Sequence, residues 1–385
     1  MSSISSTFDD RKQGRSQTTP FDDNQAMKSY ALEVKYVGDI PILDISSEQE
    51  LFLRRIRQVE KFHRMRVSNV LILTGVTTVG ILFVRRLLRI RAATSELQKL
   101  AHRVGLDVLP VGYFRVCISG TSSGIGNACA HFLSRYRSVK VFSLGRPVSC
   151  DFVADLSDPS AIRSCAIDIE REWYKGTCAP SAGFDVLINN AGVFSAATAS
   201  AIHWINSFAP AFLTEDLSER YIRNKIKSRM LRFVQVSSRL ESKSTLTAEN
   251  MRDSISESME APTRTLHYAD SKRAMMYHTS FMHNKFTLSH PSLSYVTVTP
   301  GMVNTALGRS SVWAVIWYLS YPIRFLFLRS PIEGALPVIW AAFGCPTESG
   351  VFTADQEILE RISATRDPEA GRIFSELVHE SFNSI

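Results

Sequence analysis

A strand, a glycine-rich turn and a helix follow one another within residues 114–133. Residues 114–119 (Phe-Arg-Val-Cys-Ile-Ser) have the pattern of a buried strand, residues 120–126 (Gly-Thr-Ser-Ser-Gly-Ile-Gly) form the turn, and a helical pattern follows. Glycines in such a turn let backbone N–H groups approach a phosphate closely, and the N-terminus of the helix attracts the anion. This order of elements predicts an α/β sheet with a pyrophosphate-binding turn after its first strand.

The same turn permits a second interpretation. Residues 120–124 are also a literal Gly-x-Ser-x-Gly, and a strand-turn-helix is the context in which a hydrolase would present Ser122 as its nucleophile. Such an enzyme also needs an acid and then a histidine downstream, and Asp355 and His379 are available for these parts. A serine hydrolase built on Ser122 therefore stays open as an alternative.

A tyrosine and a lysine four residues apart lie downstream, at Tyr268 and Lys272. On a helix they share one face, and a nearby ammonium favours the phenolate, so we expect the tyrosine pKa to be lowered toward neutrality, where a general acid/base works best. Two other pairs have the same spacing, Tyr136/Lys140 and Tyr221/Lys225. Only Tyr268 follows the strand that ends Val-Ser-Ser at Ser238, a hydroxyl that could hold the oxygen gaining or losing the proton.

Two further motifs complete an ordered set of five. Residues 184–192 (Phe-Asp-Val-Leu-Ile-Asn-Asn-Ala-Gly) have the pattern of a hydrophobic strand that ends in two asparagines and a tight turn, and Pro300-Gly301 follows a strand pattern over 294–299. Over residues 114–352 the set resembles the short-chain dehydrogenase/reductase family. The resemblance implies a Rossmann-type doubly wound parallel sheet, a nicotinamide dinucleotide cofactor and the interconversion of an alcohol and a carbonyl.

The resemblance also assigns roles to single residues. It implies that Ser238, rather than Ser237, orients the substrate carbonyl, that Tyr268 exchanges the proton, and that Lys272 also binds the nicotinamide ribose. Asn206, in the central helix, would position a water in the proton relay. Besides Tyr268 and Lys272, the residues implied to contact the cofactor are Gly120, Ser122, Ser123, Gly124, Ile125, Gly126, Arg146, Asp155, Asn190, Ala191, Gly192, Pro300, Gly301, Val303 and Thr305.

The chain departs from the family pattern in three places. Ser119 stands where a threonine is usual, and the stretch from Gly192 to Asn206 is short, which leaves the helix register at Asn206 open. A longer insertion lies between Ser238 and Tyr268, is polar and acidic around residues 247–261, and is also found in retinol-dehydrogenase-like members; an ordinary surface loop is the alternative. Residues 329–335 and 349–352 likewise resemble the close of those reductases.

The end of the second strand indicates which cofactor is bound. NAD-binding proteins place an acid there for the ribose 2′-hydroxyl, whereas an arginine accommodates the 2′-phosphate of NADP. Here residues 140–144 run into Gly145-Arg146-Pro147, and the next acid, Asp151, better opens the third strand. NADP(H) is therefore favoured over NAD(H), with Arg146 as the phosphate contact.

An uncharged, apolar run over residues 67–84 lies outside the recognised domain and has arginines on both sides. Its length is at the short end for a span, which takes about 20 residues, so it could cross a thin bilayer or lie in the interface. A buried core helix is the alternative. We expect a membrane anchor, and attraction to anionic lipids then accounts for much of the net charge of +7. Nucleic acid is a poor competing explanation, because no reading module accompanies the arginines.

The 385 residues leave room for one catalytic domain of about 250 residues with appendages. We expect a polar, disordered segment over residues 1–50, a membrane-anchor region over 51–92, a linker helix over 93–113, and a catalytic domain over 114–385. A hydrophobic lid over 308–330 contains Trp313 and Trp317, while Pro322 and Arg324 argue against a second span. An aromatic lid favours a lipophilic substrate such as a retinoid, steroid or fatty aldehyde or ketone, and an ordinary packed lid helix is the alternative.

The six cysteines show no paired metal-ligand spacing, so no metal is expected, and they are interpreted as reduced thiols of a cytosol-facing domain. Together with the anchor this favours the endoplasmic reticulum membrane. The sequence leaves open whether the protein forms a homodimer. It also leaves open a membrane scaffold that binds a dinucleotide without turnover.

Overall fold

We analysed a computed structural model of the whole chain. It describes residues 35–37, 40–42, 47–146, 149–174, 183–194, 198–224, 229–260, 265–305, 307, 319–345, 351–354, 357–359 and 367–384. The chain divides into two units, residues 1–78 and 79–385.

The first unit contains a short hairpin and the beginning of a long helix. Strand β1 (Lys35–Val37) pairs antiparallel with β2 (Ile40–Ile42), and helix α1 (Ser47–Arg103) begins here and runs on into the second unit. Within α1 lies one stretch that is long and apolar enough to cross a membrane, and none of that stretch is buried.

The second unit is built on one eight-stranded sheet in the order β10-β9-β8-β7-β6-β3-β4-β5. All neighbouring strands are parallel except β9 and β10, which are antiparallel. The strands are β3 (Phe114–Ser119), β4 (Val139–Gly145), β5 (Phe152–Val153), β6 (Gly183–Asn189), β7 (Arg229–Val236), β8 (Leu293–Thr299), β9 (Val351–Ala354) and β10 (Glu357–Leu359). The strand order reverses at β3, which lies between β4 and β6, so the predicted doubly wound parallel sheet is confirmed.

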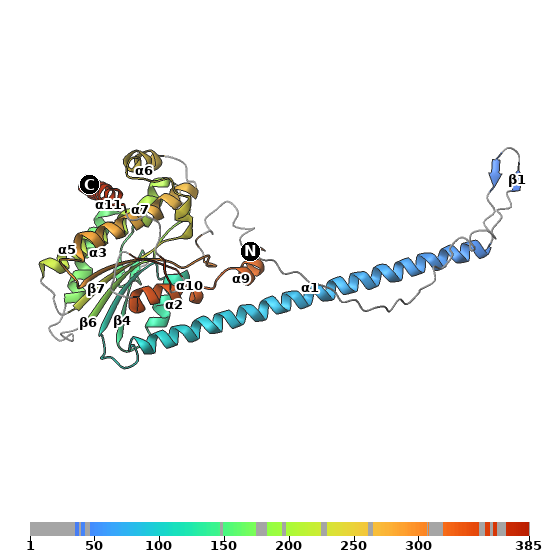
Figure 1. The fold of residues 1–385 in the computed structure, drawn as a ribbon, viewed down its shortest axis with the longest axis horizontal. Coiled ribbons are helices and arrows are strands. Elements are labelled where there is room, and N and C mark those ends of the chain that lie inside the picture. The colour runs from blue at the N-terminus through green and yellow to red at the C-terminus, as the bar shows by residue number, and fades with distance from the viewer. Residues whose placement is uncertain are drawn as a thin grey trace, which may run out of the picture. The chain divides into compact units, whose positions relative to one another are not determined.

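Helices cover both faces of this sheet (Figure 1). One face carries α2 (Gly124–Leu133), α10 (Pro331–Ile339) and the C-terminal part of α1. The other carries α3 (Pro159–Tyr174), α5 (Ala209–Arg223), α7 (Thr265–Phe286) and α11 (Pro368–Asn383). The remaining helical segments among the described residues are α4 (Ala199–His203), the π-helical turn η1 (Trp204–Phe208), η2 (Arg239–Lys243), α6 (Met251–Glu260), α9 (Tyr321–Phe327) and η4 (Trp340–Gly344).

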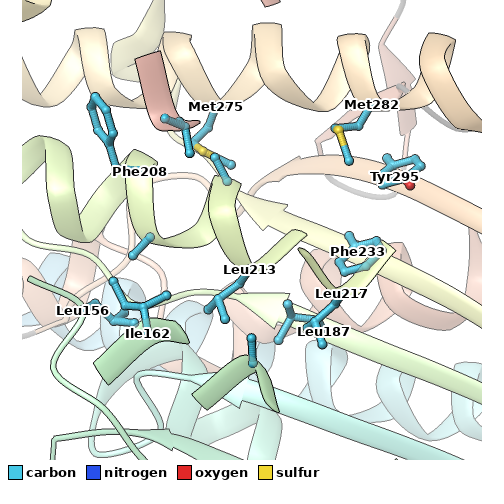
Figure 2. Packing of buried hydrophobic residues seen from close by; sticks show 14 of the residues in the cluster. Leu156, Ile162, Leu187, Phe208, Leu213, Leu217, Phe233, Met275, Met282 and Tyr295 are labelled. Atoms are coloured by element: carbon cyan, nitrogen blue, oxygen red, sulfur yellow. The ribbon is translucent and has the colours of Figure 1, made fainter. Parts of the chain in front are cut away.

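Each face of the sheet has its own hydrophobic core because successive strand residues point to opposite faces. In β3, Val116 and Ile118 join the core beneath α2 and α10, whereas Cys117 joins the core beneath α3 and α5. Figure 2 shows part of this second core, in which side chains of α5 and α7 meet those of the sheet. Because both faces of the central parallel strands are covered, even their charged residues Arg115, Asp185 and Arg232 are buried.

The C-terminal part of α1 packs into the domain and is not a separate linker. Leu97 and Leu100 are buried in the core beneath α10, and Leu106 joins them just beyond the end of the helix. The segment expected as a linker helix over 93–113 therefore contributes to the core in the structure, and the helix runs without a break through the expected boundary at residue 92.

Several predicted features fall outside the described residues. Among them are Asp355 of the hydrolase alternative, Trp313 and Trp317 of the expected lid, and Lys225 of the Tyr221/Lys225 pair. Of the expected lid over 308–330, the structure describes residues 319–330, which include α9.

Candidate active site

The carboxyl ends of β3 and β6 are joined by a small hydrogen-bond network. The Ser119 hydroxyl accepts hydrogen bonds from the backbone N–H groups of Asn190 (3.0 Å) and Ala191 (2.9 Å). The Asn190 amide nitrogen returns a hydrogen bond to the Ser119 carbonyl (2.9 Å). Asn190 and Ala191 thus hold the end of the central strand, and the turn that follows starts from a fixed position.

The turn itself has the backbone that its glycines permit. Gly120 (φ +74°) and Gly124 (φ +63°) lie in the left-handed region, which side-chain-bearing residues rarely adopt. A Cβ on Gly126 would lie 2.4 Å from the Gly120 carbonyl oxygen, so only glycine lets α2 pack this closely on the turn. Ser122 and Ser123 are exposed on the turn.

The first turn of α2 offers hydrogen-bond donors to a ligand. Its N-cap residue, Ser123, makes no side-chain capping bond, so the N–H groups of the first turn are not satisfied in that way. Unsatisfied N–H groups and the positive end of a helix dipole bind phosphate well. With the two left-handed glycines before it, this helix start fits a pyrophosphate.

The predicted turn after β8 lies against the glycine-rich turn. A Cβ on Gly124 would lie 3.1 Å from the Thr305 methyl group, and one on Gly334 of α10 would lie within 3.1 Å of both Val303 and Ile125. Gly301, after Pro300, again has a left-handed backbone (φ +76°). The structure therefore brings together the two turns whose residues the resemblance implied to contact the cofactor.

Tyr268 and Lys272 lie at the start of α7, and both are almost completely buried. The Lys272 ammonium is 5.7 Å from the centre of the Tyr268 ring and donates a hydrogen bond to the Val236 carbonyl at the end of β7 (2.9 Å). Next along the chain, Ser238 is half-buried and accepts from the Leu240 N–H (3.2 Å), whereas the Ser237 hydroxyl is turned toward the Lys272 backbone. Ser238, not Ser237, is the serine whose hydroxyl acts on the pKa of Tyr268, lowering it through a hydrogen bond.

The expected lowering of the Tyr268 pKa is wrong for this structure. Burial raises the pKa of Tyr268 to about 12, and the hydrogen bond with Ser238 offsets only part of that rise. Burial also lowers the pKa of Lys272 to about 8. The reason is that desolvation disfavours the charged form of each group, so burial favours the neutral phenol of Tyr268 and the neutral amine of Lys272.

Asn206 lies beside this pair, in the π-helical turn η1. Its amide oxygen accepts from the Val193 N–H (2.8 Å), while its amide nitrogen donates to the Val193 carbonyl (2.9 Å) and to the Ser271 hydroxyl (3.2 Å). A Cβ on Gly192 would lie 3.2 Å from the Asn206 oxygen and 3.5 Å from the Lys272 nitrogen. Despite the short connection from Gly192, Asn206 therefore reaches the neighbourhood of Lys272, and the extra residue of the π-turn changes the register there.

One arginine and two aspartates lie near the end of β4, each in a different environment. Arg146 is exposed directly after β4, and Asp155 is close enough for the arginine charge to act on it. Hydrogen bonds from Ser157 lower the pKa of Asp155, and Arg146 adds to that effect. Asp151 directly precedes β5, as expected, and its carboxylate accepts from the Ser143 N–H (2.7 Å) and hydroxyl (2.8 Å).

The rival motifs have other partners. Tyr221 is buried and donates its hydroxyl to the Arg229 carbonyl, and the Tyr136 ring packs on Phe132. His379, the histidine of the hydrolase alternative, belongs to α11 on the opposite face of the sheet from α2. There it lies 2.7 Å from a carboxylate oxygen of Glu215. These contacts give the three residues structural roles and leave the hydrolase without its histidine.

Four further side chains near Tyr268 were not among the predicted site residues. The Phe194 ring lies 5.1 Å from the Tyr268 ring, and Ser271 bonds Asn206. His203 and His267 are buried with their rings 6.5 Å apart, and none of their ring nitrogens has a hydrogen-bond partner among the described residues. The position of Ser271 next to Lys272 could have suggested a part in the site, but no sequence signal marked the other three.

Comparisons with known proteins give fold-level likenesses. No protein-family model matches the sequence, and no curated protein matches it. Among solved structures, the chain is similar to a 3-alpha-hydroxysteroid dehydrogenase from Pseudomonas sp. complexed with NADH (22% identity, 63% of this chain, 94% of that chain, TM-score 0.49). It is also similar to a short-chain type dehydrogenase/reductase from Mycobacterium marinum (16% identity, 65% of this chain, 95% of that chain, TM-score 0.47). A third similar structure is salutaridine reductase from Papaver somniferum (18% identity, 63% of this chain, 99% of that chain, TM-score 0.43). Likenesses this low carry no argument about the activity of the chain, which rests on the site itself.

Proposed function

We propose that the protein is a membrane-anchored, NADP(H)-dependent short-chain dehydrogenase/reductase that interconverts an alcohol and a carbonyl on a lipophilic substrate. The observation that carries this proposal is the cluster of Tyr268, Lys272 and Ser238 at the same edge of the sheet as the glycine-rich turn. The proton-transfer groups and the phosphate-binding start of α2 thus lie at the same edge of the sheet, near the point where the strand order reverses. In open α/β sheets, ligands bind at such a point.

The residues of the cluster divide the chemistry among them. When bound, the nicotinamide supplies or accepts the hydride, and the protein contributes binding, orientation and proton transfer. The Tyr268 hydroxyl donates its proton to the substrate oxygen during reduction and takes it back during oxidation. Ser238 hydrogen-bonds the same oxygen, and Lys272 holds the ribose and lies beside the phenol. Asn206, fixed by Val193 and Ser271, positions a water for the proton relay.

Two features support the finer parts of the proposal. Arg146 is exposed directly after β4, where a 2′-phosphate would lie, and the next acid along the chain, Asp151, is already engaged by Ser143. The apolar stretch of α1 has no burial inside the protein, which suits a helix in lipid better than a core helix. We infer that the catalytic domain faces the cytosol, because all the described cysteines are free thiols. We propose the endoplasmic reticulum as the membrane that holds the anchor.

The test is turnover by the full-length protein. Purified in detergent and given NADPH with a panel of lipophilic ketones and aldehydes, it should oxidise NADPH with at least one of them. Lys272→Ala should remove that activity. Binding of NADPH without turnover of any carbonyl would instead support a scaffold that uses the dinucleotide as a ligand. No binding of either dinucleotide would remove the proposal altogether.

A further inference from the structure

Helix α9 exposes a group of large apolar side chains. None of its residues is buried, and Tyr321, Ile323 and Phe327, together with Leu319 just before the helix, are 55% to 75% exposed. We call these four residues the α9 surface. Single exposed apolar residues are ordinary, but a group of them on one short helix marks an interaction site.

The other side of α9 is attached to the domain. The Phe325 ring lies 5.8 Å from the Phe83 ring of α1, and the Arg86 guanidinium lies over Phe325 at 5.7 Å. Arg324 donates a hydrogen bond to the Asn304 side-chain oxygen (2.6 Å). Tyr321 lies at the edge of this attached side, because its ring is 6.4 Å from the Phe325 ring and the Arg324 guanidinium lies over it at 5.8 Å. Ile323 and Phe327, four residues apart, share the face of the helix opposite Phe325, and Figure 1 shows α9 next to α1.

Arg86 fixes this part of α1 to the domain. It is almost completely buried and forms an ion pair with Glu333 (2.5 Å). Glu333 also caps α10 by accepting from the Ser330 N–H and hydroxyl, both at 2.7 Å. A buried ion pair held in place by further hydrogen bonds is costly to separate. Phe83, Arg86 and α9 consequently keep one relative position.

Phe83 is also the last residue but one of the apolar run 67–84, and the exposed Arg85 and Arg89 follow it. If residues 67–84 lie in a bilayer, their end and these arginines lie at the level of the head groups, where anionic lipid attracts positive charge. Because α9 contacts α1 at Phe83, it lies at that level too. We propose that the α9 surface enters the boundary between head groups and acyl chains of an anionic phospholipid membrane. This inference rests on the proposed membrane anchorage.

The position of α9 relative to the site gives the contact a function. Arg324 holds Asn304, which lies between Val303 and Thr305 of the turn that meets the glycine-rich loop. The backbone N–H of Asn304 in turn donates to the Arg329 carbonyl beyond α9 (2.8 Å). Lipid contact on α9 is thus one hydrogen bond away from the candidate active site. This arrangement would bring that side of the candidate active site close to the acyl chains in which a lipophilic substrate dissolves.

The experiment uses the full chain with a fluorophore on α9. In a background with Cys150 and Cys178 replaced by serine, Ile323→Cys and Phe327→Cys are each labelled with a nitrobenzoxadiazole dye. The protein is reconstituted into vesicles of phosphatidylcholine with a minority of phosphatidylserine, with or without lipids that carry a spin label on the acyl chain. The matched control is Leu288→Cys, a position that is 95% exposed and lies just beyond α7.

We expect spin-labelled lipid to quench the dye at 323 and 327 at least about twofold more than the dye at 288. Vesicle-bound protein with equal, weak quenching at all three positions would overturn the inference and leave the anchor standing. Dye shielded from water without lipid quenching, together with cross-linked dimers, would assign the α9 surface to a second copy and also overturn it. Protein that does not associate with vesicles at all would remove the anchor and this inference together.

Discussion

The ammonium nitrogen of Lys272 lies 5.7 Å from the centre of the Tyr268 ring and 2.9 Å from the Val236 carbonyl oxygen that it hydrogen-bonds. The contact ties the N-terminal half of α7 to the end of β7, so the phenol and the serine after that strand are held together. Burial moves the two pKa values in opposite directions, to about 12 for Tyr268 and about 8 for Lys272. At neutral pH the phenol therefore keeps its proton and is ready to donate it, which suits carbonyl reduction.

Tyr268→Phe should lower the rate of carbonyl reduction about 10²- to 10⁴-fold, because proton transfer to a reacting group contributes that much. NADPH affinity should stay nearly unchanged, since the ring remains and only the hydroxyl is lost. The measurement is NADPH oxidation together with NADPH binding by fluorescence.

A matched control is Tyr221→Phe, which also removes a buried hydroxyl from a tyrosine followed four residues later by a lysine. Its hydroxyl donates to the Arg229 carbonyl, so this change should cost about 1 kcal/mol of stability and leave the rate per folded molecule unchanged. Near-normal turnover by Tyr268→Phe would remove the assignment of the proton donor.

Arg146→Ala should weaken NADPH binding much more than NADH binding. A charge-assisted hydrogen bond to a phosphate is worth roughly 1.5 to 3 kcal/mol, and NADH has no 2′-phosphate to lose. Titration of both cofactors into the variant checks the prediction, with Arg135→Ala as a control at another exposed arginine. Equal losses for the two cofactors would show that Arg146 does not set the preference.

Ser122 should not react with a fluorophosphonate, because His379 is engaged by Glu215 on the other face of the sheet and cannot activate it. Ser122→Ala should cost at most about 1 kcal/mol in cofactor affinity, the usual worth of one hydrogen bond. Mass spectrometry of the labelled protein, compared with Ser123→Ala and Ser122→Ala variants, decides the matter. Stoichiometric modification of Ser122 would revive the hydrolase interpretation.

The sequence predicted the sheet and the position of the site because both depend on local patterns. Apolar strand runs set the strands, and Gly120, Gly124 and Gly301 all have the left-handed backbone that only glycine adopts easily. The short link from Gly192 to Asn206 was harder to interpret. A π-helical turn adds a residue there without any sequence mark, and that turn brings Asn206 to Val193 and Ser271.

What the sequence could not predict depends on burial and on distant contacts. The pKa of Tyr268 was expected to fall because only its neighbour four residues away was visible, whereas desolvation by the whole surrounding fold raises it. Likewise, no local pattern predicts the ion pair between Arg86 and Glu333, because the two residues are far apart in the chain and meet only in the folded domain. For the same reason the helix expected over residues 93–113 was interpreted as a linker, whereas in the structure it is the end of α1 and packs into the core.

Acid should destabilise the protein partly through His203. Burial, together with the nearby His267, lowers the pKa of His203 from 6.5 to about 3. Between these values the unfolded chain binds a proton that the folded protein does not, so stability falls as the pH falls. This one group should cost the folded state roughly 1.5 kcal/mol between pH 6.5 and about 5.

His203→Leu should therefore flatten the dependence of the melting temperature on pH in this range without loss of stability at the lower pH. Replacing a buried, unpartnered polar ring by an apolar side chain leaves no donor or acceptor unsatisfied. His131→Leu, at an exposed position of α2, is the control and should leave the pH dependence as it was. An unchanged slope in His203→Leu would show that other groups govern the acid response.

Charges placed in the apolar run of α1 should release the protein from membranes. Val76 and Val79 lie near the middle of residues 67–84 and are more than half exposed, so aspartate at both should keep the fold while opposing insertion. An aspartate at the centre of a span costs about 2.5 to 3.5 kcal/mol on insertion scales, and two cost about twice that.

The matched control is aspartate at Val108 and Val111, which are equally apolar and exposed but lie beyond the helix. After carbonate extraction, the unaltered protein and the control should stay in the membrane pellet, and Val76→Asp/Val79→Asp should move to the supernatant. Extraction of the unaltered protein as readily as a soluble enzyme would mean that residues 67–84 are not an anchor, because a helix held by lipid does not leave the bilayer under these conditions.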